Sequence, residues 1–185
     1  MNSSFCSSDE NRILKYFNEQ DILIVNESAS RAEELVSNYY KMSSSQLLGL
    51  KYDIKTLADL NEHEIVYGPF AQVIRYEVKQ KGTNLGSLTY DFYKICIQDH
   101  AVISKLKQFP KIKLFPFMLY IVVHELIHIV RFCKFLQHFD ASSKEKMAEE
   151  IRVHERTREI MQSSSIKGTK EVLQFYCDWC EKHKP

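Results

Sequence analysis

Glycine and proline are scarce in this chain, with 5 and 4 copies among 185 residues. Long flexible linkers are therefore not expected, and the length suits one domain, or one domain with a small appendage. Positive and negative charges are also nearly balanced, with a net charge of +1. This overall charge argues against nucleic acid or a membrane surface as a partner. Hydrophobic residues make up 44% of the chain, enough to bury the core of an ordinary globular protein.

The chain also lacks the apolar stretches that mark export or membrane insertion. Its first residues, MNSSFCSSDENR, are polar and do not resemble the hydrophobic region of a secretory signal. The longest apolar run, LFPFMLYIVV at 114–123, is far shorter than the ~20 residues that span a bilayer. The five cysteines are odd in number and show no disulfide framework. We therefore expect a cytoplasmic protein with reduced thiols and no membrane segment.

Helical periodicity covers much of the chain. This spacing predicts helices at 9–20, 29–42 and 143–162, and a short helix in the tail TKEVLQFYCDWCEKHKP. A longer apolar helix is predicted from Pro116, a residue favoured in a first helical turn, to about Phe139. The short apolar run DILIV, 21–25, is predicted to be a strand.

A change of hydrophobic period after residue 70 predicts a β-hairpin. Apolar and polar residues alternate in QVIRYEV and again in GSLTYDFYKICI, and turn residues KGTNLG separate the two segments. After Phe92 the apolar set shifts to Tyr93, Ile95 and Ile97, which indicates either a bulge or burial on the other face. Helices with one small hairpin predict an α+β fold. We expect residues 66–185 to form the core domain and residues 1–65 to be a mainly helical segment packed on it.

The run VVHELIHIVRF, 122–132, places three ionisable side chains in apolar sequence. On a helix, His124 and His128 lie one turn apart on the same face, so both imidazoles can bind one ion. Glu125 is rotated by about 100° from His124, which places it beside the ion, where a base can act on metal-activated water. This is the zinc-peptidase pattern His-Glu-x-x-His. The alternative, two core histidines and a paired carboxylate, would bury Glu125 at a cost.

A catalytic zinc usually has three protein ligands, so a third ligand is expected on the next helix. The apolar stripe of that helix is read as Met147, Ile151 and Met161. Glu150 and His154 fall on this stripe, whereas Glu149 groups with Val153 and Ile160. We therefore predict Glu150 as the third metal ligand, with Glu149 and His154 as alternatives. The other interpretation is that Glu150 and His154 are boundary residues on a charged helix.

These residues resemble the glutamate-type zincins (gluzincins), the clan of thermolysin-like peptidases and their minimal single-domain relatives. In that clan His-Glu-x-x-His is followed by a glutamate ligand on a later helix, about twenty residues on. Here Glu149 and Glu150 come 21 and 22 residues after His128. Thermolysin-like enzymes carry an aspartate four residues after the ligand glutamate, where this chain has His154. The resemblance covers roughly residues 70–162.

The resemblance implies a zincin-like single domain with metallopeptidase activity. Zn²⁺ would be bound by His124, His128 and Glu150, and Glu125 would be the general base for water that hydrolyses a peptide bond. The substrate would be a peptide or protein, held in extended form along an edge strand of the hairpin. Such enzymes usually hold the oxyanion with a histidine or tyrosine. The candidates here are His154, Tyr120 and Arg131.

Three other interpretations are open. The chain could be a non-catalytic zinc-binding protein of zincin fold, because sequence does not reveal a substrate cleft. A helical di-metal carboxylate site needs a second Glu-x-x-His besides Glu125 and His128, and the chain has none. Cys177 and Cys180, with His183, could form a redox pair or half a zinc site, but a single Cys-x-x-Cys is a weak signal.

Four lysines surround Pro110: Lys105, Lys107, Lys111 and Lys113. They could form an anion-binding patch. A solvated connection between elements is the simpler interpretation.

Overall fold

The computed structural model describes residues 14–79, 89–134, 136 and 142–182. Within these ranges the chain forms an α+β fold, as predicted. The helices are α1 (Glu19–Tyr39), α2 (Ser44–Gly49), α3 (Asp99–Gln108), α4 (Leu114–Cys133), α5 (Ser143–Ser163) and α6 (Thr169–Lys182). The strands are β1 (Tyr52–Lys55), β2 (Ala71–Lys79) and β3 (Thr89–Ile97). Two short 3-10 helices, Leu57–Asp59 and Glu62–Glu64, connect β1 to β2.

The three strands form one sheet in the order β1-β3-β2. β2 and β3 are antiparallel, from the pair Ala71 and Ile97 to the pair Lys79 and Thr89, so the predicted hairpin is confirmed. Its turn, residues 80–88, lies outside the described part of the chain. The register between the two strands has no offset, and the shift of apolar residues after Phe92 therefore reflects burial on the other face. β1 runs parallel to β3, so residues before and after position 65 share the sheet.

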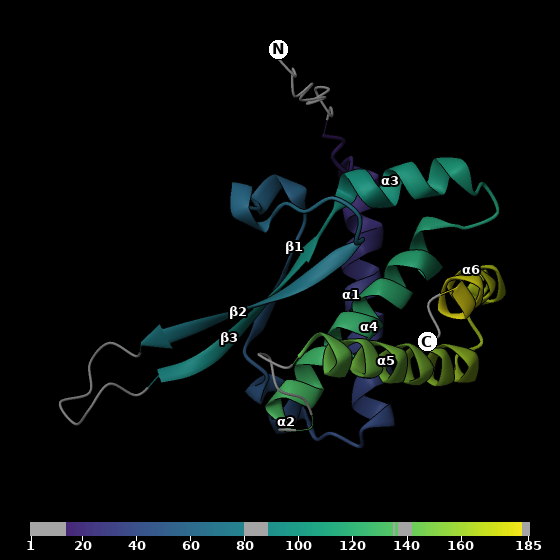
Figure 1. The fold of residues 1–185 in the computed structure, drawn as a ribbon. Helices are drawn as coiled ribbons and strands as arrows, with labels where there is room; N and C mark the ends of the chain where they lie inside the picture. The colour runs from purple at the N-terminus through teal and green to yellow at the C-terminus, as the bar shows by residue number, and fades with distance from the viewer. Residues whose placement is uncertain (1–13, 80–88, 135, 137–141, 183–185) are drawn as a thin grey trace, which may run out of the picture.

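Helix α4 is the centre of the core. It contacts α1, α5, α6 and the strands β2 and β3 (Figure 1). α4 is long and apolar enough, by length and composition, to cross a membrane, but 83% of its apolar window is buried inside the protein. The core helix of a globular protein has the same properties. α4 ends at Cys133, and the predicted end near Phe139 falls outside the described residues.

The N-terminal elements differ from the prediction. One helix, α1, spans the predicted strand at 21–25 and most of the predicted helix at 29–42. The predicted helix at 9–20 is wrong for residues 14–18, which are not helical, and its residues 9–13 lie outside the described part of the chain. The start of α1 is fixed by a capping box, in which the Asn18 side chain accepts from the backbone N–H of Asp21 and the Asp21 side chain accepts from that of Asn18. From there Val25, Ala32 and Val36 are buried at helical spacing. The run DILIV, with four apolar residues in a row, was read as a strand, although it belongs to the first turns of this amphipathic helix.

Helix α3 was not predicted, and it contains two of the lysines assigned to a connection, Lys105 and Lys107. Its hydrophobic pattern is weak because Val102 is its one buried apolar residue. A buried carboxylate fixes the start of α3 instead: Asp99 accepts hydrogen bonds from the backbone N–H groups of Phe17 and Leu57, at 3.0 and 2.9 Å. The predicted helices at 143–162 and in the tail are present as α5 and α6, and Ser142 caps α5.

A buried carboxylate also holds the segment that leads into β2. Glu64 is fully buried and accepts hydrogen bonds from Lys94 Nζ at 2.6 Å, from the Tyr76 hydroxyl and from the Asn61 backbone. The pKa of Glu64 falls to about 2, because these donors outweigh the opposing effect of burial. The side chains of Gln72 and Gln98 donate to the Glu64 carbonyl. This network fixes residues 61–66, which precede the turn at Gly68 and the start of β2.

Candidate metal centre

His124 and His128 extend from one face of α4, as their spacing predicts. His124 is buried and His128 is partly buried, and their Nε2 atoms lie 3.2 Å apart. At this distance the two imidazoles direct their ring nitrogens at one point in space. The buried sides of α4, formed by apolar residues such as Val123 and Ile127, prevent the helix from rotating this pair into solvent.

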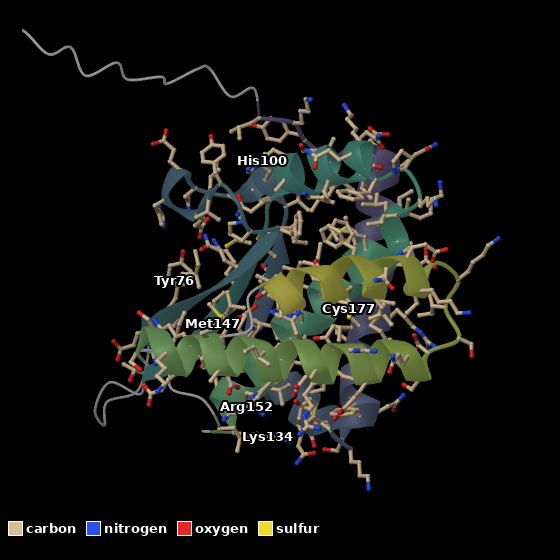
Figure 2. All side chains as sticks on the ribbon, turned by 45° about the vertical axis from the view of Figure 1, so that its right-hand side comes forward. Tyr76, His100, Lys134, Met147, Arg152 and Cys177 are labelled. Atoms are coloured by element: carbon tan, nitrogen blue, oxygen red, sulfur yellow. The ribbon has the colours of Figure 1, made fainter. Side chains whose placement is uncertain are left out.

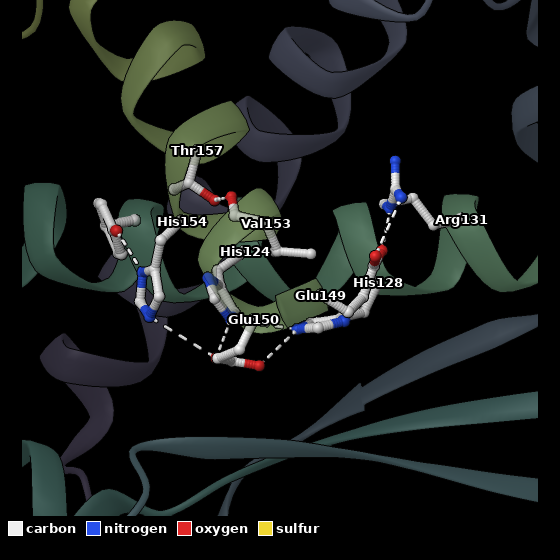
Figure 3. Close-up of polar contacts among 9 residues, drawn as sticks. His124, His128, Arg131, Glu149, Glu150, Val153, His154 and Thr157 are labelled. Atoms are coloured by element: carbon white, nitrogen blue, oxygen red, sulfur yellow. Dashed lines mark hydrogen bonds and ion pairs between the residues drawn. The ribbon is translucent and has the colours of Figure 1, made fainter. Parts of the chain in front are cut away.

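The carboxylate of Glu150 on α5 lies against both histidines. Its Oε1 is 2.9 Å from His124 Nε2, and its Oε2 is 3.3 Å from His128 Nε2 (Figure 3). His154 Nε2, one turn further along α5, lies 3.6 Å from Oε1 of the same carboxylate. We call these four side chains the histidine–glutamate cluster. The pKa of Glu150 is lowered, because hydrogen bonds to His124 and His128 outweigh the effect of its burial.

The donor atoms of the histidine–glutamate cluster fit a zinc ion in type and spacing. Imidazole nitrogen and carboxylate oxygen are ligands that zinc takes at about 2.0–2.2 Å, and tetrahedral donors at that length lie about 3.3 Å apart. The observed separations of 2.9, 3.2, 3.3 and 3.6 Å are close to this value. One ligand atom each of His124, Glu150 and His154 also lies within 4.8 Å of the others, so these three residues could hold a metal ion as well.

Glu149 does not join the cluster. Its buried carboxylate pairs with Arg131 on α4, through Nε and through Nη2 at 3.1 Å, and with Arg152 at 3.1 Å. Hydrogen bonds from Arg131 and Arg152 lower its pKa against the effect of burial. Because Glu149 is held by Arg131, the next residue, Glu150, is turned toward the histidines.

The stripe used to choose between the two glutamates is correct only in part. Met161 and His154 are buried as predicted, but Met147 is 45% exposed, and Glu149, Val153, Thr157 and Ile160 are also buried. Met147 and Arg152, which are labelled on opposite edges of α5 in Figure 2, are both exposed. Glu150 lies at the edge of the buried face, with 35% of its side chain exposed, where the cluster meets an open cleft. Polar contacts across the helix interface, not apolar periodicity, set the rotation of α5.

Glu125 lies beside the cluster and lines the same cleft. Burial raises the pKa of its carboxyl group, and the neighbouring Glu150 adds to this, while His124 and His128 oppose it. Among the residues that the structure describes, it forms no ion pair of the kind that holds Glu149. Its position next to the ligand face, without being part of it, matches the sequence expectation.

His154 is oriented by Tyr120, whose hydroxyl lies 2.7 Å from His154 Nδ1. Burial lowers the pKa of His154 to about 3, with help from the nearby His124 and His128 and against the effect of Glu150, so the ring is neutral. Two arrangements of the proton are possible. If the Tyr120 hydroxyl donates to Nδ1, then Nε2 carries the proton and is a donor. If Nδ1 donates to the hydroxyl, Nε2 is free to bind a metal.

The other candidates for the oxyanion differ in position. Tyr120 also lines the cleft, but its hydroxyl is engaged by His154, and Arg131 is engaged by Glu149. Tyr176 on α6 was not predicted. Its ring stacks on that of Tyr120, with centroids 3.8 Å apart, and it lines the cleft. No spacing rule connects α6 to the motif on α4, so the sequence carried no signal for this residue.

His124 lacks the outer partner that metal-binding histidines usually have. Its Nδ1 is buried without a hydrogen-bond partner among the residues that the structure describes. In most zinc sites this nitrogen donates to a carboxylate or a carbonyl group. The ring of His124 is instead held by packing, with Tyr120 and His154 at 6.4 and 4.4 Å between ring centroids.

A cleft of about 460 Å³ opens over the cluster. Its walls come from the start of β2, from α4 and α5, and from α6. The apolar part of the lining includes Phe70, Ala71, Ile121 and Phe175, and the polar part includes Lys105 of α3. The cleft therefore has room beside the histidine–glutamate cluster for part of another molecule.

Cys177 is partly buried on α6 and has no disulfide partner among the described residues. The side chain of Cys180 and the whole of His183 fall outside the described part of the chain, so the interpretation of Cys177 and Cys180 as a redox pair or half a zinc site stays open.

Comparison of the chain with protein-family models, with curated proteins and with solved structures found no match. A function has to be inferred from the geometry of the side chains.

Proposed function

We propose that this protein is a zinc-dependent metallopeptidase with a zincin-like core. The observation that carries the proposal is the position of Glu150, whose two carboxylate oxygens lie 2.9 Å from His124 Nε2 and 3.3 Å from His128 Nε2. Two histidines one helical turn apart and a glutamate from the next helix are a three-ligand set that leaves one position open for water.

His124, His128 and Glu150 would hold the zinc ion. When bound, zinc supplies a Lewis acid that lowers the pKa of water and polarises a carbonyl group. Glu125 accepts a proton from the water that attacks the scissile carbonyl carbon, and then delivers it to the nitrogen of the leaving amine. Its surroundings support this role, because it lines the cleft next to His124 and Glu150 and has no ion pair with any residue in the described part of the chain.

His154 supports the same reaction as a donor. With the Tyr120 hydroxyl donating to Nδ1, the proton on Nε2 points to the cleft side of Glu150, where negative charge develops on the carbonyl oxygen. Tyr120 is then a positioning residue that selects the tautomer of His154. Both side chains come from the helices that carry the metal ligands, so their geometry is fixed by the same packing.

The strand β2 offers a place for extended substrate. It is an edge of the sheet, and Phe70 and Ala71 at its start line the cleft. A peptide that pairs with the free edge of β2 would use main-chain hydrogen bonds and pass over the metal centre. Peptides or unfolded protein segments are therefore the proposed substrates.

The proposal is tested by metal analysis together with one substitution. We expect one zinc per chain after native purification, and cleavage within a peptide library. Glu125→Gln should keep the zinc and lower cleavage by about 10² to 10⁴, because glutamine cannot accept the proton. Glu155→Gln, on the exposed face of α5, is the matched control and should cleave as the parent does. Zinc-free protein that gains no thermal stability on addition of zinc would contradict the proposal.

A non-catalytic zinc-binding role is the second candidate, and the position of His154 favours it. If Nε2 of His154 were a fourth ligand beside His124, His128 and Glu150, the site would be closed, as structural zinc sites are. Such a protein would bind zinc with high affinity and cleave nothing. The zinc affinity of a Tyr120 variant separates the two roles, as argued below.

A further inference from the structure

Lys105 extends from α3 to the wall of the cleft that contains the metal centre. It lines the same cavity as His124, Glu125 and Glu150. It is the one lysine or arginine among the described residues that line this cavity, whose other charged groups are carboxylates. A positive charge at this place has no role in binding the metal or in the proton transfers assigned to Glu125.

The ammonium group of Lys105 is held in place by neutral neighbours. Its Nζ lies 5.4 Å from the ring centroid of Phe109 and 5.7 Å from that of Phe175, and it donates to Gln108 Oε1 at 3.1 Å. Phe175 is fixed in turn by packing against Phe117 of α4, at 5.9 Å between centroids. In the part of the chain that the structure describes, Lys105 forms no ion pair with a carboxylate.

A partly buried cation next to aromatic rings, without an acidic partner of its own, is suited to bind a carboxylate from another molecule. The aromatic rings reduce the competition from water, and the lysine supplies the charge. A peptide in this cleft has two sources of such a group: the side chain of aspartate or glutamate, and its own C-terminus. Both present the same two oxygens to Nζ.

We propose that Lys105 forms a carboxylate-binding subsite of the cleft, so that the preferred substrates are peptides with an acidic group on one side of the scissile bond. This inference rests on the proposed peptidase function and specifies its substrate class. It also gives a use to one of the four lysines near Pro110, because α3 turns Lys105 inward. Lys107, on the same helix, is exposed and does not line the cleft.

The test compares cleavage of peptides that differ in one charge. One alanine-rich sequence is made with Glu, Gln or Lys at each position in turn, and each peptide has either a free or an amidated C-terminus. The parent protein should cleave a Glu peptide or a free-carboxylate peptide about tenfold better, in kcat/KM, than its neutral match. Preference for Glu at an internal position identifies a side-chain subsite, and preference for the free terminus identifies a carboxypeptidase-like subsite.

Lys105→Glu should remove this preference and favour the Lys peptide, and Lys105→Gln should remove the preference without reversing it. Lys107→Glu changes the net charge equally and should behave as the parent does. The glutamine variant keeps the test valid if the reversed charge next to Glu125 and Glu150 impairs folding. Cleavage by the parent without any preference for a carboxylate, or an equal effect of Lys107→Glu, would overturn the inference.

A parent protein that cleaves no peptide would count against the peptidase proposal, and the subsite is then decided by binding. The probes are the same Glu, Gln and Lys peptides, carrying a neutral dye, titrated against zinc-loaded protein. Tighter binding of the acidic peptide that is lost in Lys105→Gln and kept in Lys107→Glu would support the subsite without hydrolysis. Equal binding of all three peptides would reject it.

Discussion

Glu149 and Glu150 are adjacent in sequence but serve different partners: Glu149 binds Arg131, and Glu150 lies against His124 and His128. Arg131 comes three residues after His128 on α4. The ion pair and the histidine–glutamate cluster are therefore neighbouring contacts of one helix interface. The ion pair orients α5, and this orientation presents Glu150 to the histidines.

The first prediction concerns the free energy of unfolding. Arg131→Met leaves the carboxylate of Glu149 buried with only the exposed Arg152 beside it, and we expect a loss of about 3–5 kcal/mol. Arg152→Met removes a partner whose side chain is 61% exposed, and we expect a loss under about 1 kcal/mol. Urea unfolding of the two variants without metal measures both values. Equal losses would contradict the assignment of Arg131 as the anchor of α5.

The second prediction concerns zinc affinity. Glu150→Ala should weaken zinc binding by more than about 100-fold, beyond the range seen when an outer partner of a ligand is lost. Glu149→Gln should reduce stability but leave the ligand set intact, so that folded protein still binds zinc within about tenfold of the parent. Competition with a chelator at a temperature where both variants are folded gives the two affinities. The reverse order would make Glu149 the ligand and require a different rotation of α5 in solution.

Sequence patterns were sufficient where they depended on local spacing. The His124–His128 pair, the hairpin and α5 follow from periods of four and two residues and from the cap at Ser142. Position 150 was selected by a stripe that the structure supports at His154 and Met161 but not at Met147, and the stripe missed the buried charged residue Glu149. The spacing of apolar residues along a helix does not reveal a buried ion pair such as that of Glu149 with Arg131.

The remaining features depend on contacts between distant segments. The start of α3 depends on the carboxylate of Asp99, which binds backbone groups at Phe17 and Leu57. Tyr176 reaches the cleft because α6 packs against α4, and Lys105 reaches it from α3 beside Phe175 of α6. Neither position has a fixed spacing relative to the motif. Side chains that enter a cleft from separate helices leave no periodic signal in one sequence.

The third prediction concerns the pH dependence of stability through Glu64. Its pKa is about 2 in the folded protein and 4.5 in its ordinary state, so the charged form is favoured by folding. The resulting stabilisation, on the order of 3 kcal/mol, is fully present above pH 4.5 and is lost as the pH falls toward 2. Glu64→Gln should be less stable at pH 7, since Lys94 loses its partner, and should lose less stability than the parent between pH 5 and pH 3.

The control for this titration is Glu62→Gln, an exposed carboxyl two residues earlier in the same segment. Its unfolding free energy should follow the parent across the whole pH range. Measurements are made by urea unfolding at each pH on metal-free protein, so that loss of zinc in acid does not contribute. A parent and a Glu64→Gln variant with parallel pH curves would show that the carboxylate of Glu64 is not stabilised by its donors.

The fourth prediction separates a catalytic from a closed zinc site through the hydroxyl of Tyr120, which lies 2.7 Å from His154 Nδ1. If Nε2 of His154 is a donor to the oxyanion, Tyr120→Phe should leave zinc affinity unchanged and lower kcat by about tenfold or more, with little change in KM. If His154 is a fourth ligand, Tyr120 is its outer partner, and the same variant should lose about 10- to 100-fold in zinc affinity.

Tyr52→Phe is the matched control, because its hydroxyl binds Glu33 at the contact of β1 with α1 and not the cluster. It should change neither zinc affinity nor kcat. The split between kcat and zinc affinity also distinguishes a role in positioning His154 from general loss of packing, since a loosened α4–α5 interface would lower both. A Tyr120→Phe variant with parent-like kcat and parent-like zinc affinity would remove His154 from the reaction and leave Tyr176, which stacks on Tyr120 and lines the cleft, as the remaining donor for the oxyanion.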